Sequence, residues 1–279
     1  MPINKNSLQA KINNLSNKSG VHQNILLKAF FFDEFLKRLS ISKYSENFVF
    51  KGGFLLSTSL GINLRSTMDV DFLLTKMKLD KDVLVNTLTE VASIDIDDSV
   101  TFEINEVNEI RLEDEYGGYN IVLIGRLENI KEVVSIDIAT GDPITPEAIN
   151  YEYRTMLNND VLHFKAYNFE TIVSEKMQTV LFKDVINSRS KDYYDLFIIY
   201  KLKLNSLDNS VLKEAFARTC NYRKTIFTKA EAKEIVNRIE NDSQMRTRWN
   251  SYCKKNKFAE GIKFEETIHA ISYFLEIVL

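Results

Sequence analysis

A chain of 279 residues can hold one large domain or two of ordinary size. Its hydrophobic content of 44%, with 18 Phe and 12 Tyr, suffices for a packed core and excludes disordered and fibrous proteins. The formal net charge of −3 excludes a strongly basic protein overall but permits a local basic face.

The numbers and positions of cysteine and histidine residues indicate the cellular compartment and exclude some kinds of active site. Cys220 and Cys253 are the only cysteines, and the N-terminal stretch MPINKNSLQAKINN has no apolar signal segment, so we expect a reducing, cytoplasmic setting. No run reaches the roughly 18 apolar residues that span a bilayer, so no membrane contact is expected. The histidines, His22, His163 and His269, are scattered, which argues against a zinc site or a histidine-based triad.

Two helices are predicted before the first strand. Residues 3–19 are polar, with Leu8, Ile12 and Leu15 at helical spacing. From His22 to Leu39 a broad apolar stripe indicates an amphipathic helix that packs on the flank of a sheet.

The stretch Phe48–Leu74 carries the strongest chemical signal. An apolar run turns through Gly52-Gly53 into a predicted helix over Phe54–Leu60, and a second apolar strand carries Asp69 and Asp71. Residues two apart in a strand share a face, so these carboxylates project together and suit a divalent cation such as Mg²⁺. The glycines let backbone N–H groups approach an anion at a helix N-terminus. Together they predict a nucleoside triphosphate held through its magnesium.

Each feature has an ordinary alternative. A Gly-Gly pair is often only a turn, and an Asp-x-Asp is often a solvated strand edge. The combination is more specific, because unpaired charge in an apolar strand is costly.

The middle of the chain predicts a helix over Lys81–Val91 and two strands. Asp95–Asn108 alternates apolar and polar residues, and Tyr119–Leu127 is expected to be its neighbour across a turn at Gly117-Gly118. Residues 90–115 hold ten acidic residues and one basic residue, which we interpret as a solvated acidic face without a catalytic role.

Val133–Ala139 is an apolar run interrupted by Asp137. Beside the strand of Asp69 and Asp71, Asp137 would complete a three-carboxylate cluster able to hold two metals roughly 3.5–4 Å apart, as used in phosphoryl chemistry. The alternative is an aspartate that caps the following loop, Gly141–Pro146.

The second half is predicted to be mainly helical, because no Gly or Pro occurs between Glu147 and Glu260. A short strand over Val161–Ala166 precedes the helices. We place the domain boundary near Tyr167, with domains 1–166 and 167–279. The expected helices are Phe169–Lys183, Lys191–Lys203, Val211–Cys220, Lys229–Asn241, Met245–Asn256 and Phe264–Ile277.

Two of these helices carry charged motifs. Glu175-Lys176 lies near the edge of an apolar stripe, and Asp192 and Asp195 are i and i+3 neighbours on one helix face, next to Lys191. Ordinary surface salt bridges are the alternative.

A set of short motifs between about Phe48 and Tyr200 resembles the AbiEii/AbiGii toxin family, nucleotidyltransferase-like proteins of the DNA polymerase β superfamily. The resemblance implies an α+β fold: a polymerase-β-like nucleotidyltransferase domain with a mixed sheet flanked by helices, followed by a mainly helical C-terminal domain. The motifs are Lys51-Gly52-Gly53, Arg65-Ser66-Thr67-Met68-Asp69-Val70-Asp71, Ser135-Ile136-Asp137, Glu175-Lys176 and Lys191-Asp192-x-x-Asp195-Leu196.

The resemblance implies roles for the residues that match. Gly52 and Gly53 would cradle the triphosphate, and Asp69 and Asp71 would hold Mg²⁺ or Mn²⁺. Asp137 would be the third metal-binding carboxylate, positioned to activate the attacking hydroxyl.

The helical motifs would serve the same nucleotide. Lys176 and Lys191 would neutralise phosphate charge, while Asp192 and Asp195 would complete the pocket. Arg65 is a further candidate for phosphate contact.

One departure from related enzymes lies in the glycine turn. Many carry Gly-Ser, whereas this chain has Gly-Gly-Phe after Lys51, which belongs to the same phosphate-binding motif. The missing hydroxyl is expected to be supplied by Ser57 or Thr58, or not to be replaced at all.

The family implies a toxin of a bacterial toxin–antitoxin or abortive-infection (phage-defence) system that transfers a nucleotide from an NTP to RNA, with the tRNA 3′ end as the preferred acceptor. A neighbouring antitoxin is implied, with or without direct binding. The alternatives are transfer to a protein hydroxyl or a small molecule, and a nucleotide-binding regulator without turnover.

Residues 213–263 add modest support for RNA, with 13 Lys/Arg against 6 Asp/Glu interleaved with aromatic residues. Solvated helix faces explain most of these charges. A specific hypothesis assigns the acceptor-binding face to Arg246, Arg248, Lys254, Lys255 and Lys257.

Overall fold

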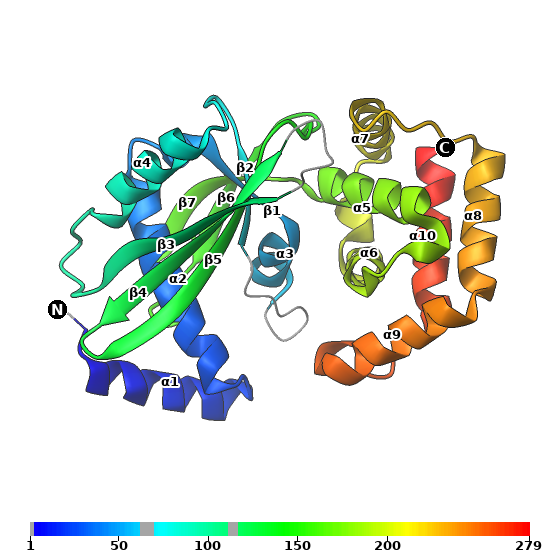
Figure 1. Cartoon of the computed structure of the whole chain (residues 1–279). Coiled ribbons are helices and arrows are strands. Elements are labelled where there is room, and N and C mark those ends of the chain that lie inside the picture. Colours follow the sequence, from blue (N-terminus) through cyan, green and yellow to red (C-terminus); the bar gives the residue numbers. More distant parts are fainter. Residues whose placement is uncertain (1–2, 62–69, 111–116) are drawn as a thin grey trace. The chain divides into compact units, whose positions relative to one another are not determined.

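The computed structural model describes residues 3–61, 70–110 and 117–279, which form two compact units (Figure 1). The first unit comprises residues 1–141 and 149–166, and the second comprises residues 142–148 and 167–279.

Within its described residues, the first unit is built on one mixed sheet of seven strands in the order β3-β4-β5-β2-β1-β7-β6. The pairs β2–β5 and β1–β7 are parallel, and the other neighbouring strands are antiparallel. The strands are β1 (Phe48–Lys51), β2 (Val70–Leu74), β3 (Thr101–Ile110), β4 (Gly118–Leu127), β5 (Ile130–Ala139), β6 (Ile149–Arg154) and β7 (Val161–Ala166).

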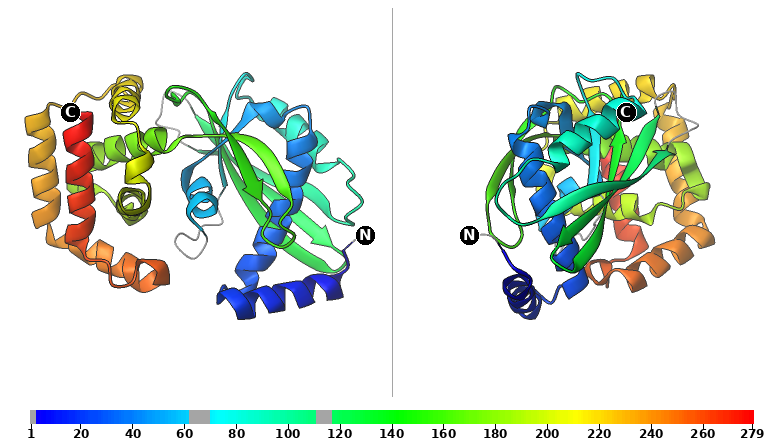
Figure 2. Two further views of the ribbon diagram at one scale, coloured as in Figure 1. Left: turned by 180° about the vertical axis from the view of Figure 1, so that it is seen from behind. Right: turned by 60° about the vertical axis from the view of Figure 1, so that its left-hand side comes forward.

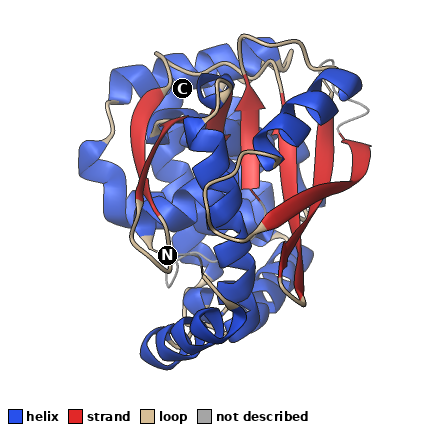
Figure 3. Cartoon of the chain, turned by 90° about the vertical axis from the view of Figure 1, so that its left-hand side faces the viewer, coloured by secondary structure: helices blue, strands red, loops and turns tan. Residues whose placement is uncertain are grey.

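Four helices accompany this sheet in the described part of the first unit: α1 (Lys5–Ser19), α2 (Gln23–Ile41), α3 (Gly52–Leu60) and α4 (Lys81–Ala92). Helix α2 runs across the twisted sheet, where it contacts β5 and β7, and it is also packed against α1 and α4 (Figures 2 and 3). It is therefore apolar over more than one side: Phe30, Phe31 and Phe32 are all buried.

A close contact identifies the sheet face that α2 covers. A Cβ on Gly125 would lie 2.4 Å from the ring of Phe31, so glycine lets the helix approach β4. Because side chains alternate along a strand, Leu123 and Leu127 share this buried face with Gly125, and Asn120 points to the opposite face.

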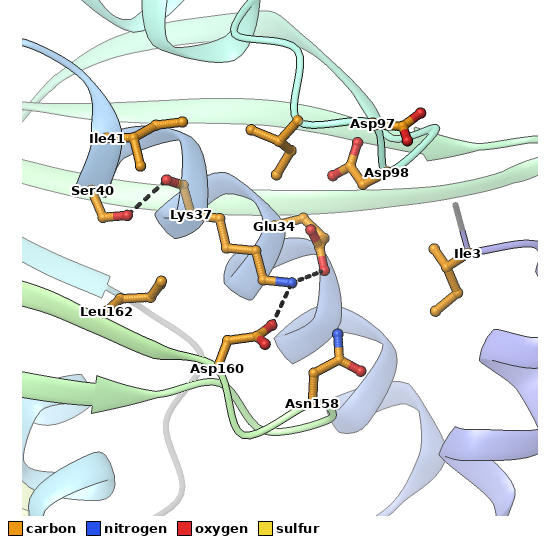
Figure 4. A pocket seen from close by; sticks show the side chains of 11 residues that line it. Ile3, Glu34, Lys37, Ser40, Ile41, Asp97, Asp98, Asn158, Asp160 and Leu162 are labelled. Carbon is orange, nitrogen blue, oxygen red and sulfur yellow. Dashed lines mark hydrogen bonds and ion pairs between the residues drawn. The ribbon is translucent and has the colours of Figure 1, made fainter. Parts of the chain in front are cut away.

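Helix α2 is also joined to neighbouring loops by an ion-pair network that borders a cavity of about 470 Å³ (Figure 4). Lys37 Nζ lies 2.9 Å from Glu34 Oε1 and 2.8 Å from Asp160 Oδ2. Arg38 is buried, and both of its terminal nitrogens donate to Asp98 at 2.7 Å. The network fixes α2 against the segments that precede β3 and β7.

The sequence predicted mainly helical structure after Glu147 and did not predict strand β6. It is an edge strand that pairs with β7, and Ile149 on it is exposed. Tyr151 and Tyr153 project together against the ring of Phe50 on β1. This strand is stabilised by tertiary contacts, which a scan for helix breakers does not detect. The other predicted strands and helices are observed, with ends shifted by a few residues.

The second unit is helical. Its α-helices are α5 (Phe169–Lys183), α6 (Ser190–Lys203), α7 (Asn209–Tyr222), α8 (Lys229–Asn241), α9 (Ser243–Lys255) and α10 (Phe264–Val278), with the short 3₁₀ turns η2 (Asp184–Ile186), η3 (Leu204–Ser206) and η4 (Lys257–Ala259); the first unit has η1 (Ser45–Asn47). Helix α10 contacts each of the other five and buries an apolar face that includes Ile268, Ile271 and Phe274.

Residues 142–148 belong to the second unit, although β6 and β7 follow them in the chain. The backbone N–H of Thr145 donates to the hydroxyl of Thr171 at 3.1 Å, and Asn168 donates to the carbonyl of Thr145 at 2.6 Å. Arg223 lies 3.4 Å from Asp142. These contacts explain why the segment packs with the helices.

Among the residues that the structure describes, no helix is both long enough and apolar enough to cross a membrane. The α+β fold predicted from the sequence is confirmed.

Candidate active site

The glycine turn lies where β1 ends and α3 begins. The helix starts at Gly52, two residues earlier than predicted, and Gly52 has φ +68°, a conformation that side chains disfavour. A Cβ at this position would lie 2.1 Å from Oδ2 of Asp71. Position 52 therefore requires glycine for two reasons, the positive φ and the lack of room for a Cβ. The backbone of Gly52 lies directly against the Asp71 carboxylate.

The N-terminus of α3 is suited to an anion. Lys51 is its N-cap residue. Within the described part of the chain, the Lys51 side chain makes no capping hydrogen bond to the first turn of α3, whereas the N-cap side chains of α4 and α5 do so in their helices. The first N–H groups of such a helix can bind phosphate oxygens.

Asp71 and Asp137 are direct neighbours in the parallel pair β2–β5. The predicted position of the Asp137 strand beside the Asp71 strand is therefore correct. Lys51 lies opposite Asp71 on β1, and Asn120 lies opposite Asp137 on β4. Because paired residues share a sheet face, these four side chains form a polar row across β4, β5, β2 and β1, which we call the carboxylate row.

The carboxylate row is held by apolar residues on either side of each acid. Val70 and Phe72 flank Asp71, Ile136 and Ile138 flank Asp137, and all four are buried on the α2 side of the sheet. Asp71, Asp137 and Asn120 are partly exposed, so the row is accessible from its own face, while Lys51 is 4% exposed.

Asn120 was not predicted as a site residue. Its amide nitrogen donates to Asp137 Oδ1 at 2.6 Å and to the Ser135 hydroxyl at 2.7 Å. The available signal was a polar amide within the otherwise apolar run YNIVLIGRL, and such a residue in a strand needs a partner.

Two predicted residues, Asp69 and Arg65, lie outside the described residues. Over the described ranges, no group of three His, Cys, Asp or Glu side chains could hold a metal ion. The donor chemistry still fits a hard cation, because Asp71 and Asp137 are partly exposed carboxylates at paired positions on one sheet face.

Ser57 and Thr58, the candidates for replacing the serine hydroxyl that related enzymes carry in the glycine turn, both use their hydroxyls for hydrogen bonds within α3. Ser57 is buried, and its hydroxyl donates to the Phe54 carbonyl at 3.0 Å. Thr58 bonds the same carbonyl and accepts a hydrogen bond from Tyr151 at 2.7 Å.

In the second unit, the charged motifs of α5 and α6 meet in a buried cluster. Lys176 Nζ lies 2.9 Å from Asp192 Oδ1 and 2.7 Å from Asp195 Oδ2. Arg189 Nε lies 2.6 Å from the second oxygen of Asp192. The side chains of Asp192 and Asp195 are 1% and 0% exposed, so these contacts are not the surface salt bridges considered as the alternative.

Ion pairing outweighs desolvation in this cluster. Burial disfavours the charged form of Asp192, but Lys176 and Arg189 hold the pKa of its carboxyl well below the usual range. Burial likewise opposes the charge of Lys176, yet the two aspartates raise the pKa of its ammonium. Asp192 and Lys176 therefore both stay charged at neutral pH.

Lys191 has a different environment. It is exposed on the first turn of α6, next to Arg189, whose side chain is 47% exposed. These two cations face solvent, whereas Lys176 is enclosed at 11% exposure.

The five residues proposed to bind an acceptor divide into two groups. Arg246 pairs with Glu265 and lies over the ring of Phe264. Arg248 donates to the carbonyls of Val185 and Asn187 at 2.8 and 3.2 Å. Both arginines thus connect α9 to its neighbours, while the three lysines at the end of α9 and in η4 are exposed: Lys254, Lys255 and Lys257.

Comparison with protein families matches residues 34–270 to the family described as nucleotidyl transferase AbiEii toxin, Type IV TA system. The match covers most of the chain. The chain belongs to this family. It is a nucleotidyltransferase of the AbiEii type, as the sequence motifs predicted.

The fold is shared with a solved structure. A candidate nucleotidyltransferase from H. pylori is 14% identical, covers 92% of this chain and 96% of its own, and superposes with a TM-score of 0.51, which shows the shared fold. JHP933 from Helicobacter pylori is 15% identical, with 92% and 93% covered and a TM-score of 0.49. No curated protein sequence matches the chain significantly.

Proposed function

We propose that this AbiEii-family protein transfers a nucleotide from a nucleoside triphosphate to RNA, with the tRNA 3′ end as the acceptor and blocked translation as the result. The observation that carries the proposal is the in-register pair of Asp71 and Asp137, with the backbone of Gly52 against Asp71. The turn proposed to bind phosphate and the pair proposed to bind a cation thus adjoin each other in the sheet.

The first unit supplies the groups that hold the nucleotide. Gly52 and Gly53 present the N–H groups of the α3 N-terminus to the triphosphate, and Lys51 carries positive charge in the same row. Ser57 supports this turn from within α3 through its bond to Phe54.

Asp69, Asp71 and Asp137 are proposed as the ligands of Mg²⁺ or Mn²⁺. When bound, such cations stabilise the negative charge that develops on the α-phosphoryl oxygens and on departing pyrophosphate. Asp137 is also the carboxylate proposed to accept the proton of the attacking RNA hydroxyl. Arg65 is proposed to contact a phosphate.

Charged residues of the second unit are also proposed to serve nucleotide transfer. Lys191 is exposed and is proposed to meet a phosphate directly. Lys176 and Asp192 are proposed to shape the nucleotide pocket, and Asp195 fixes Lys176 through their 2.7 Å contact. Lys254, Lys255 and Lys257 are the exposed cations proposed to contact the RNA backbone.

The test is a mass measurement of total tRNA after incubation with the protein, Mg²⁺ and each triphosphate separately. The expected result is an increase in tRNA mass by one or more nucleotides, which is lost in Asp71→Ala. Parallel incubations with protein acceptors and with small-molecule acceptors test the two other enzymatic alternatives. Label in either acceptor but not in tRNA would overturn the RNA proposal, and magnesium-dependent nucleotide binding without pyrophosphate release would indicate a regulator.

The type IV toxin–antitoxin family implies an antitoxin. We propose that it counteracts the product of this protein, with or without direct contact. Co-purification of the two proteins would distinguish these modes.

A further inference from the structure

Asn120 stands outside every motif that led to the nucleotidyltransferase family, yet it makes two short hydrogen bonds within the carboxylate row. Its amide nitrogen lies 2.6 Å from Asp137 Oδ1 and 2.7 Å from the Ser135 hydroxyl oxygen. A carboxylate can only accept hydrogen bonds, so the nitrogen rather than the oxygen of the amide must face Asp137. Both amide hydrogens are thereby directed at β5.

The three residues lie on the inner strands of the sheet. Asn120 is paired with Asp137 across β4 and β5, and Ser135 is two residues away on the same face of β5. Strand β5 lies between β4 and β2, so Asn120 and Asp71 flank Asp137 from opposite sides. Side chains on paired inner strands have little freedom to move apart.

We propose that Asn120 is a positioning residue that fixes the orientation of the Asp137 carboxylate for metal binding and proton acceptance. This inference rests on the proposed function of Asp137. The bond takes one oxygen, Oδ1, and so defines the plane in which the other oxygen, Oδ2, lies. Partners of metal-binding carboxylates commonly contribute 10–100-fold to metal affinity or activity.

Ser135 explains why an amide suits this position. A side chain with a single donor could bond either Ser135 or Asp137, whereas the amide NH₂ group bonds both and is restrained by two acceptors. The serine hydroxyl thus fixes Asn120, and Asn120 fixes Asp137.

The experiment compares Asn120→Ala with Asn120→Leu, which keeps the approximate size and branching of the side chain but removes both donors without adding a charge. Binding of Mn²⁺ in the presence of a non-hydrolysable NTP analogue is measured without any acceptor, alongside kcat and KM for the NTP. Both variants should lose about 10-fold or more in Mn²⁺ affinity and in kcat, with KM changed by less than about 2-fold. Asn120→Leu should be as impaired as Asn120→Ala, because neither side chain donates a hydrogen bond to Asp137.

A purely structural role predicts a different pattern. The similarly sized Asn120→Leu would then be the milder variant, and Asn120→Ala would reduce Mn²⁺ affinity equally in the wild-type and Asp137→Ala backgrounds. The inference expects no further loss in the Asp137→Ala background, since the group that Asn120 orients is already gone. Asn150→Ala is the matched control: Asn150 is an exposed strand asparagine that accepts a bond from Lys165 at 2.7 Å.

The outcomes separate this inference from the proposed function. Unchanged Mn²⁺ affinity in Asn120→Ala overturns the inference alone. Weakened Mn²⁺ binding without transfer to RNA by the wild type supports the inference while the acceptor proposal fails. A wild-type protein that binds no Mn²⁺ overturns the metal site and this inference with it.

Discussion

Acidic side chains come together in both units, but with different partners. In the second unit, Asp192 and Asp195 are enclosed with Lys176 and Arg189, so two negative and two positive charges meet at 2.6–2.9 Å. In the first unit, Asp71 and Asp137 are partly exposed neighbours on parallel strands.

The difference teaches how one chain uses the same residue type in two ways. Buried carboxylates that are matched by cations are expensive to disturb, because removing one partner leaves an uncompensated charge. Carboxylates that adjoin each other on an accessible face repel one another and gain from an added cation. The first arrangement indicates a preassembled support, and the second indicates a ligand site.

The largest effect is expected from removing an acid of the carboxylate row. Asp71→Ala or Asp137→Ala should lower nucleotide transfer by about 10³-fold or more, because the proposed cation ligands are lost. The midpoint of thermal unfolding should change little, because relief of like-charge repulsion offsets the loss of the charge opposite Lys51 or of the bond from Asn120. A cooperative loss of folding in either variant would show that these carboxylates are structural.

The next largest effect should come from the buried cluster of the second unit. Lys176→Met leaves Asp192 and Asp195 without their shared cation, and should lower the free energy of unfolding by about 3–5 kcal/mol. Urea denaturation measures this loss. Lys191→Met, at an exposed position, is the matched control and should change stability by less than about 0.5 kcal/mol.

Gly52→Ala tests the contact between the glycine turn and the carboxylate row. The added Cβ would collide with Asp71 Oδ2 and would also adopt φ +68°, so we expect a loss of stability of about 3 kcal/mol and reduced transfer. Gly20→Ala separates the two causes. Gly20 has φ +72° but no atom within 4 Å of its Cβ position, so the control should show the backbone cost alone, about 1 kcal/mol. Equal losses in both variants would contradict a specific role for the Asp71 contact.

The smallest effect concerns Glu34, a buried acid of the first unit outside the carboxylate row. Burial and the nearby Asp98 raise the pKa of Glu34 to about 7, against the opposing effect of Lys37. Between the unfolded value of 4.5 and about 7 the folded state therefore binds the extra proton, so stability should fall as pH rises through this range. From pH 5.5 to pH 8 this group should remove about 2 kcal/mol.

Glu34→Gln should flatten that dependence, because an amide has no proton to lose. Denaturant unfolding at pH 5.5 and pH 8 measures the change. Glu103→Gln, an exposed acid on β3, removes the same charge and should leave the slope as in the wild type. An unaltered slope in Glu34→Gln would assign the pH dependence to other groups, of which Asp33 is the first: burial raises its pKa to about 7 as well.

Particular residues show how far sequence reasoning reached. The alternation around Asp71 and the apolar run around Asp137 predicted two strands, because each acid interrupts an otherwise buried strand. The i, i+3 spacing predicted that Asp192 and Asp195 share a helix face, and both do contact Lys176. Strand β6 and the role of Arg248 in joining α9 to the segment around η2 were missed, because both depend on contacts between segments far apart in the chain.

The sequence by itself determined the elements, the family and the residues that could carry the chemistry, since periodicity and short motifs are local properties. Only the tertiary structure decided which acids would be neighbours. The register of β2 with β5 brings Asp71 to Asp137, the register of β4 with β5 adds Asn120, and the packing of α5 on α6 encloses Lys176. Register and helix packing arise from the burial of whole apolar faces, a collective property that no single motif encodes.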